Sequence, residues 1–311
     1  MREIQFQGKT MKEWTVGPSR FVAWPEQGAR LIAWDVSYGR DTKRDVIFWP
    51  EQADMTKSHT VRGGNPILFP FCGRTYCDGE MGFWRTPEGE RRPMPMHGFA
   101  RECAFAMEEM DERGFLGRMI PSPIVAESYP YPFEFRVRYA FGELSLVVTL
   151  SLKNLGTTPI PWSAGHHFYF TMPWHAGATR GDYRILLPAK KAFNRAADGS
   201  LAPVKDYAMP KPDAVFPLND AGLLDRIHTH LQSNDIRFGP KNGEQDVRVI
   251  IGDAARPTPN TALVTWSESE TAPFYCVEPW MGPPNSPSTK VGLHFVNPGE
   301  TAEFVVKVSL E

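Results

Sequence analysis

Cysteine is scarce in this chain, which has four cysteines in 311 residues. They are Cys72, Cys77, Cys103 and Cys276, and the step from Cys72 to Cys77 is wider than the two-residue gap of a zinc knuckle. We therefore interpret all four as buried, reduced thiols of a cytoplasmic protein. We expect no metal site and no cofactor.

Long hydrophobic runs are also missing. No apolar run reaches the ~18 residues that a membrane-spanning helix needs, and the first residues, "MREIQFQGKTMKEW", have no apolar signal-peptide core. The net charge of −2 provides no basic field for a nucleic acid. We expect neither a membrane nor a nucleic acid as a partner.

Several familiar catalytic motifs are absent. The sequence has no G-x-S-x-G, so an α/β-hydrolase nucleophile is disfavoured. "VRGGNP" matches neither the dinucleotide-binding nor the Walker spacing, and "GHHFYF" lacks the glutamate and helical spacing of a zinc protease. These absences argue against three large classes of enzyme.

The chain is instead rich in short extended segments. "FEFRVRYAF" and "ELSLVVTLSLKNLG" alternate apolar and polar residues, which is typical of strands with one solvated face. "RFVAWP", "ARLIAWDV", "DVIFWP", "TALVTWSES" and "AEFVVKVSL" are short, β-branched or aromatic, and 29 prolines and 26 glycines separate such segments. With no repeat and no linker, residues 1–311 are predicted to form one all-β domain, a large sandwich.

Three segments carry side chains suited to acid/base chemistry. His97 in "PMPMHGFAR" lies between a proline and a glycine, on backbone that can aim a side chain at a ligand. In "AGHHFYF", alternation places His167 and Tyr169 on one face and His166 on the other. Glu278 in "CVEPW" is expected where a core strand ends. A lone histidine among aromatics is more often structural, but an imidazole and a carboxylate in one pocket form an acid/base pair.

Six segments occur in an order that suggests a family, between roughly residues 60 and 300: "NPILFPFCGR", "PMHGFAR", "GHHFYF", "PLNDAGLL", "CVEPWMGPP" and "LHFVNPGE". Together they resemble the aldose 1-epimerase (galactose mutarotase-like) superfamily, and most closely its LacX-like branch. The resemblance implies a β-supersandwich of antiparallel sheets with a monosaccharide in a cleft on one concave sheet.

The resemblance also implies catalytic roles. His167 corresponds to the histidine that donates a proton to the ring oxygen of the sugar. Glu278 corresponds to the base that acts on the anomeric hydroxyl, and His97 to a histidine that hydrogen-bonds the sugar near the reacting centre. A carboxylate beside a histidinium would satisfy both needs at one pH, because each charge stabilises the other.

The same resemblance suggests substrate-binding residues. Arg74 is suited to bidentate hydrogen bonding with sugar oxygens. Asp220 is expected to accept hydrogen bonds from hydroxyls, and Trp280 and Phe71 are expected to stack on the apolar face of the sugar. The assembly is expected to be a monomer or a homodimer.

Two alternatives remain open from the sequence. In a hexose-6-phosphate 1-epimerase, Arg62 and Arg101 would clamp the phosphate. A non-catalytic sugar-binding protein could also use this scaffold, because fold does not fix function. A glycosidase is disfavoured, since Glu278 has only Asp220 as a candidate second carboxylate.

Overall fold

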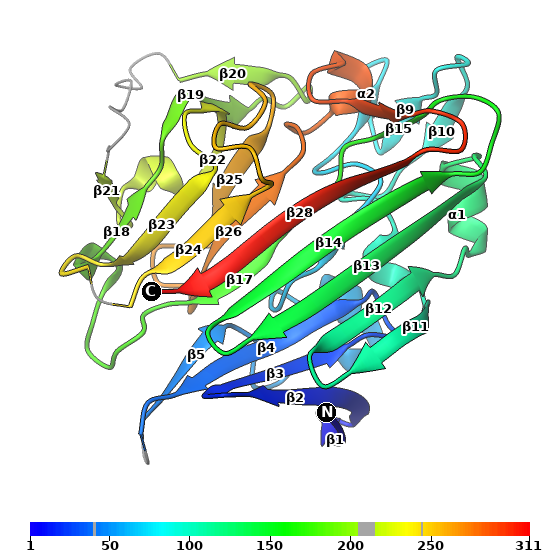
Figure 1. Ribbon diagram of the computed structural model, residues 1–311. Helices are drawn as coiled ribbons and strands as arrows, with labels where there is room; N and C mark the ends of the chain where they lie inside the picture. Colours follow the sequence, from blue (N-terminus) through cyan, green and yellow to red (C-terminus); the bar gives the residue numbers. More distant parts are fainter. Residues whose placement is uncertain (40–41, 205–214, 244) are drawn as a thin grey trace.

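The computed structural model describes residues 1–39, 42–204, 215–243 and 245–311, and its regular structure is mainly β (Figure 1). Two large antiparallel sheets account for most of the strands. In Figure 1 the long strands β13, β14 and β28 run side by side across the front of the molecule. The prediction of an all-β, antiparallel architecture is confirmed.

The larger sheet has thirteen strands within the described residues. Along its main path they lie in the order β1 (Arg2–Phe6), β2 (Lys9–Val16), β3 (Ser19–Trp24), β4 (Arg30–Ser37), β5 (Lys43–Ile47), β17 (Phe168–Thr171), β26 (Phe274–Trp280), β25 (Ala262–Trp266), β22 (Asp225–Leu231), β19 (Ala189–Arg195) and β20 (Leu201–Pro203). Two short strands complete it: β16 (Gly165–His166) pairs with β26 and with β6 (Ile67–Leu68).

The second sheet has nine strands in the described residues. Their order is β11 (Phe105–Asp111), β12 (Gly114–Met119), β13 (Phe133–Gly142), β14 (Ser145–Asn154), β28 (Thr301–Leu310), β24 (Val247–Ile251), β23 (Asp235–Pro240), β18 (Tyr183–Leu186) and β21 (Val215–Pro217).

The remaining elements are short. In the part of the chain that the structure describes, three two-stranded ribbons pair β9 (Phe83–Arg85) with β10 (Arg91–Pro93), β15 (Ile160–Trp162) with β27 (His294–Val296), and β7 (Tyr76–Cys77) with β8 (Glu80–Met81). The helices are α1 (Pro123–Ser128), α2 (Ser286–Thr289) and the 3-10 turns η1 (Met55–Thr60), η2 (Ala100–Glu102), η3 (Arg180–Asp182) and η4 (Ala221–Leu223). The described residues contain no helix with the length and hydrophobicity that a bilayer crossing requires.

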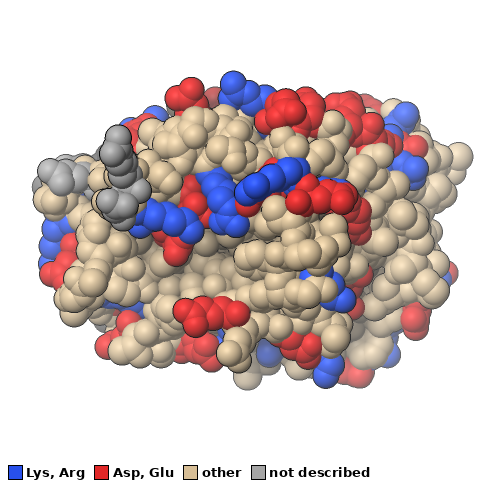
Figure 2. Space-filling view, turned by 90° about the horizontal axis from the view of Figure 1, so that it is seen from below, with Lys and Arg blue, Asp and Glu red and all other residues tan. Residues whose placement is uncertain are grey.

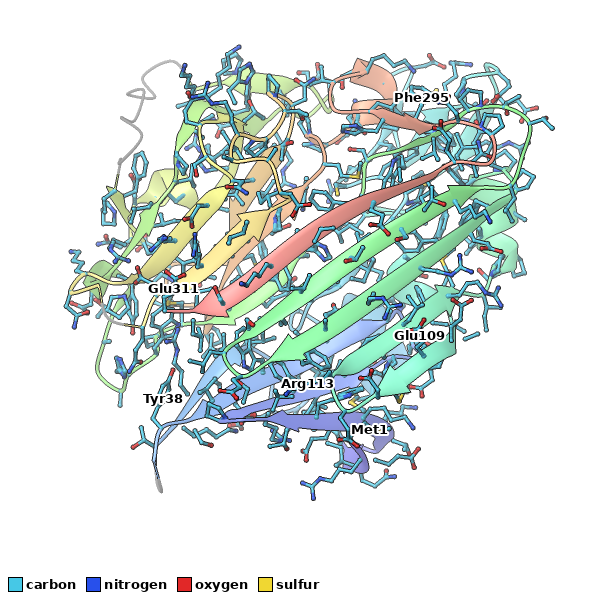
Figure 3. The ribbon with its side chains drawn as sticks, in the orientation of Figure 1. Met1, Tyr38, Glu109, Arg113, Phe295 and Glu311 are labelled. Atoms are coloured by element: carbon cyan, nitrogen blue, oxygen red, sulfur yellow. The ribbon has the colours of Figure 1, made fainter. Side chains whose placement is uncertain are left out.

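The alternation of β13 divides this strand between core and solvent. Phe135, Val137 and Tyr139 are buried in the main hydrophobic cluster, as the period of two predicts. On the outer face, Arg138 pairs with Glu109 of β11 at 2.9 Å, and Glu109 carries a label in Figure 3. On the face in Figure 2, basic and acidic side chains are interspersed, and neither sign covers the whole face.

Strand β26 connects the core to the functional site. Tyr275 and Val277 belong to the main hydrophobic cluster, whereas Cys276, Glu278 and Trp280 alternate with them on the opposite face of the sheet. The sequence predicted that the strand would end at Glu278, but it continues through Trp280. Glu278 therefore lies within the sheet and not at the rim of a cleft.

Candidate active site

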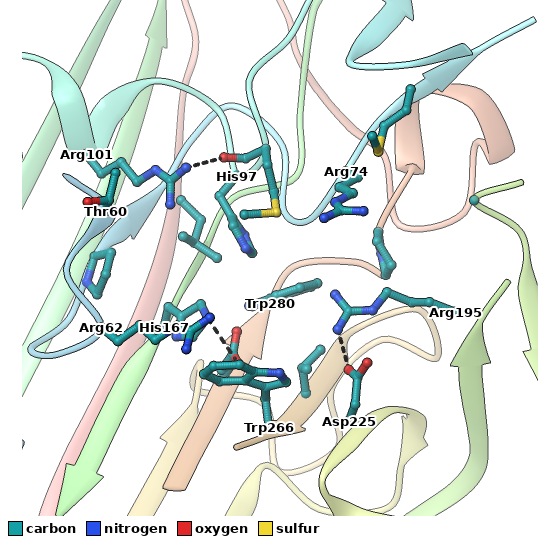
Figure 4. Close-up of a pocket in the computed structure, with 18 of the residues that line it drawn as sticks. Thr60, Arg62, Arg74, His97, Arg101, His167, Arg195, Asp225, Trp266 and Trp280 are labelled. Atoms are coloured by element: carbon teal, nitrogen blue, oxygen red, sulfur yellow. Dashed lines mark hydrogen bonds and ion pairs between the residues drawn. The ribbon is translucent and has the colours of Figure 1, made fainter. Parts of the chain in front are cut away.

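A cavity of about 1010 Å³ lies over the face of β26 that carries Glu278. Its walls are loops that precede β6 and β11 and the ends of β19, β22 and β25 (Figure 4). The cavity brings together six of the eight site residues predicted from the sequence: His97, His167, Glu278, Arg74, Arg101 and Trp280.

His167 and Glu278 face each other across neighbouring strands. Phe168 pairs with Val277 in the antiparallel register, so the preceding residue, His167, comes opposite Glu278. His167 Nε2 lies 3.4 Å from Glu278 Oε1, slightly beyond the usual length of a hydrogen bond. His167 Nδ1 and Glu278 Oε2 are buried without a hydrogen-bond partner among the described residues. The pair is thus close together and has free polar atoms for a ligand.

Burial dominates the electrostatics of this pair. It lowers the pKa of His167 to about 3, and nearby Arg101 contributes in the same direction. Burial also raises the pKa of Glu278 well above its ordinary value. Without a ligand, the neutral forms of both groups are favoured. The sequence had suggested a carboxylate beside a histidinium, and the difference arises because both side chains are removed from water.

His97 is held by reciprocal hydrogen bonds with Gly73. Its backbone N–H donates to the Gly73 carbonyl at 2.7 Å, and the Gly73 N–H donates to His97 Nδ1 at 3.2 Å. Because Nδ1 accepts, the ring proton resides on Nε2 and is available for donation to a ligand. The sharp backbone requires Gly98, where φ is +71° and a Cβ would lie 1.9 Å from the Phe69 carbonyl oxygen.

The first histidine of the doublet, His166, is structural. His166 is fully buried on the core face and stacks on Phe168 and Phe304, with ring centroids 5.3 and 5.9 Å apart. Its Nδ1 lies 3.2 Å from Nδ2 of Asn65, whose Oδ1 accepts a hydrogen bond from the backbone N–H of His167. The prediction that His166 and His167 point to opposite faces is confirmed.

Arginines surround the cavity, and they differ in their partners. Arg62 pairs with Glu268, and Arg195 of β19 pairs with Asp225 of β22. Of the described residues, none forms a hydrogen bond or ion pair with the exposed guanidinium of Arg74.

Arg101 is the second arginine near His97, and it donates to the Met96 carbonyl at 2.8 Å but to no carboxylate in the described part of the chain. Figure 4 shows His97 between Arg101 and Arg74. Two cationic groups without an acidic partner therefore flank this histidine.

Two predicted substrate contacts lie elsewhere. Phe71 is fully buried and packs its ring against Trp84 with centroids 4.9 Å apart, so it belongs to the core and does not line the cavity. Asp220 caps η4 by accepting a hydrogen bond from the backbone N–H of Gly222 at 2.8 Å, and it also does not line the cavity. The expected sugar contacts of Phe71 and Asp220 are not supported.

Sequence reasoning missed several lining residues, among them Trp266, Arg195 and Asp225. The Trp266 ring makes an edge contact with His167, with centroids 6.0 Å apart. The alternation in "TALVTWSES" does place Trp266 on the same face of its strand as Val264. It did not indicate that Val264 pairs with Glu278.

A buried arginine positions the wall that carries Arg62. Arg30 is 3% exposed, and its guanidinium donates to the carbonyl oxygens of Ser58, Val61 and Gly63. Replacing Arg30 with methionine leaves these buried acceptors unpaired, at about 1–3 kcal/mol each. We expect Arg30→Met to lower the free energy of unfolding by at least one such increment, measured by chemical denaturation.

The control for this change is Arg138→Met on the outer face of the nine-stranded sheet. The exposed pair of Arg138 with Glu109 contributes about 1 kcal/mol or less. Equal losses of stability in the two variants would contradict the role assigned to Arg30.

Comparison with known proteins agrees with this architecture. Residues 17–309 match the aldose 1-epimerase family. The chain is 28% identical to the chromosomal LacX protein of Lactococcus lactis over 236 residues, which cover 71% of this chain and 74% of LacX.

Two solved structures share the fold. A galactose mutarotase related enzyme from Lactobacillus acidophilus is 20% identical, with a TM-score of 0.76 and 97% of each chain covered. A galactose mutarotase-like protein from Clostridium acetobutylicum is 16% identical, with a TM-score of 0.77 and coverage of 100% of this chain and 98% of that one. The protein therefore has a galactose mutarotase-like β-supersandwich fold.

The family match covers nearly the whole chain, and the resemblance found in the sequence is confirmed. The chain belongs to the aldose 1-epimerase family.

Proposed function

We propose that the protein is an aldose 1-epimerase that interconverts the α and β anomers of a hexose without a cofactor. The observation that carries the proposal is the 3.4 Å approach of His167 Nε2 to Glu278 Oε1 on the floor of the cavity. The hydroxyl oxygen O1 and the ring oxygen O5 are both bonded to C1 of the sugar. An acid and a base that serve these two oxygens must therefore lie close together.

The reaction needs only proton transfers within this pair. Glu278 accepts the proton of the O1 hydroxyl while His167 donates a proton to O5, and the C1–O5 bond breaks to give the open-chain aldehyde. Rotation about the C1–C2 bond then exposes the other face of C1. The ring closes as O5 returns its proton to His167 and Glu278 returns a proton to O1.

One proton is sufficient for the pair. In the empty cavity it resides on Glu278, because burial favours the two neutral groups. Hydroxyl groups of a bound sugar would hydrogen-bond the free Oε2 of Glu278 and stabilise the carboxylate. The proton can then pass to His167 across the 3.4 Å contact.

Two further residues would hold the sugar. The Nε2–H of His97 is available as a donor to a sugar oxygen, because Nδ1 is occupied by Gly73. The ring of Trp280 lines the cavity and meets His97 edge-on with centroids 5.7 Å apart, which supports its role as an apolar platform. His97 and Trp280 thus offer one polar and one apolar contact on the same wall.

A hexose 6-phosphate is the second candidate substrate. The observation that favours it is the presence of Arg74 and Arg101 without acidic partners on either side of His97. Guanidinium groups match the geometry of a phosphate and can bind it through two parallel hydrogen bonds. Arg62, which the sequence suggested for this role, is already paired with Glu268.

Substrate comparison tests the two candidates. Anomer exchange of glucose, galactose and glucose 6-phosphate is followed by polarimetry or NMR, with wild-type protein and Arg74→Gln. If phosphate is recognised, the substitution should raise KM for glucose 6-phosphate by about 10- to 100-fold, as expected for the loss of a charged hydrogen bond. The KM for the free sugars should change much less.

Preference for the free sugars, with equal effects of Arg74→Gln on all three substrates, would reject the phosphate. Binding of sugars without any acceleration of anomer exchange would reject the epimerase and favour a non-catalytic sugar-binding protein.

A further inference from the structure

A buried thiol lies beside the proposed acid/base pair. Cys276 and Glu278 are two residues apart on β26 and project to the same face, and His167 comes from the neighbouring segment. One donor atom from each of Cys276, His167 and Glu278 lies within 4.8 Å of the other two. Cys276 is fully buried and is not itself a lining residue of the cavity.

Two polar atoms of this cluster have no hydrogen-bond partner among the described residues. Glu278 is 1% exposed, and its Oε2 has no hydrogen-bond partner there. The same is true of His167 Nδ1. Both side chains line the cavity, which gives an ion a path from solvent to the cluster. Unpaired buried donors and acceptors are costly, so a group that satisfies them would be stabilised.

We propose that Cys276, His167 and Glu278 form a binding site for a Zn²⁺ ion that reversibly blocks the cavity. Sulfur, imidazole nitrogen and carboxylate oxygen are the three donor types that zinc takes in proteins. Three protein ligands leave the fourth tetrahedral position to water. Donor atoms about 2.0–2.3 Å from one tetrahedral ion lie roughly 3.3–3.8 Å apart, so the donor atoms of this cluster would have to approach one another by up to about 1 Å.

The charges of this complex balance. The Cys276 thiol and the Glu278 carboxylic acid each release a proton to solvent as the ion binds, and neutral His167 donates a lone pair. The ion, the thiolate and the carboxylate then sum to zero net charge, which avoids the cost of burying an unpaired ion. No electron is transferred, and the ion takes no part in anomer exchange.

Inhibition by zinc follows from the proposed function. The ion would bind the same two side chains, His167 and Glu278, that the sugar needs, so sugar and zinc should compete. Binding of the ion itself does not depend on the epimerase activity, and it can be measured separately.

Direct metal binding is the first arm of the test. Untagged, metal-free protein is titrated with Zn²⁺ against a chromophoric chelator, and with Co²⁺ alone to detect the near-ultraviolet charge-transfer absorption of a thiolate–cobalt bond. We expect one equivalent to bind with a thiolate band. Cys276→Ser should remove the band and weaken zinc binding by about tenfold or more. Cys276→Ala provides a second variant should the buried hydroxyl impair folding.

The matched control is Cys103→Ser, which changes another buried cysteine that does not line the cavity. It should retain both the band and the zinc affinity. Equal zinc affinity in Cys276→Ser and Cys103→Ser, or a cobalt complex without the thiolate band, would overturn the site.

Anomer exchange is the second arm. Zinc should raise the apparent KM of wild-type protein, EDTA should reverse the effect, and Cys276→Ser should be at least about tenfold less sensitive. If the same zinc concentration half-inhibits the wild-type protein and the Cys276→Ser protein, the proposal is contradicted. If no anomer exchange is found but the thiolate–cobalt complex forms, the zinc site stands and only the proposed function fails.

Discussion

Glu278→Gln is expected to lower the rate of anomer exchange by about 10²- to 10⁴-fold. The amide keeps the shape of the carboxylic acid but cannot accept the proton of the O1 hydroxyl. Because burial already favours the neutral form of Glu278, a neutral amide should be tolerated on the floor of the cavity, and the protein should remain folded. Polarimetry measures the rate, and NMR titration measures sugar binding, which should persist.

Glu303→Gln is the control for this experiment, because Glu303 lies on the exposed face of β28 and its side chain accepts a hydrogen bond from Ser151. The Glu303→Gln protein should exchange anomers at the wild-type rate. Glu278→Gln protein with an unchanged rate would remove the carboxylate from the mechanism, whereas a loss of sugar binding would indicate a structural role.

The histidine doublet provides the second strong prediction. His167→Asn should slow anomer exchange by about 10²- to 10⁴-fold with little loss of stability, because it removes the acid from the cavity. His166→Asn should leave the rate nearly unchanged. It should lower the free energy of unfolding by about 1–3 kcal/mol, because it disturbs a buried hydrogen bond and the stack on Phe168 and Phe304.

The two variants form a crossed comparison, with polarimetry for activity and chemical denaturation for stability. Each variant acts as the control for the other, since the two residues are adjacent in the chain. Loss of activity in His166→Asn with full activity in His167→Asn would reverse the assignment of the proton donor.

The regular strands were predictable from the sequence. The alternation of "FEFRVRYAF" and "ELSLVVTLSLKNLG" gives β13 and β14 because a period of two, maintained over many residues, matches one buried face. The same logic placed His167 and His166 on opposite faces. The predicted end of β26 was wrong. Proline normally interrupts a central strand, but here Pro279 remains within β26 and pairs with Leu263 of β25.

The parts of the site outside the strands were harder to predict. Phe71 follows Pro70 in a stretch with little regular structure, so no periodicity indicates which way its side chain points. Asp220 lies beside a short turn, and its capping role depends on the local backbone. Arg195 and Asp225 meet only because β19 and β22 are neighbours in the sheet, and a single sequence does not reveal strand order.

The proposed catalytic base and the arginines at the cavity wall lie on different kinds of backbone. Glu278 is fixed by hydrogen-bonded neighbours on both sides of β26, whereas Arg62 and Arg74 extend from connecting segments. Protein engineers could therefore graft these connecting segments from one family member to another to change which sugar is accepted, while the proton-transfer geometry is retained. The loops would be exchanged between family members, and the same sheet would support enzymes with different sugar specificities.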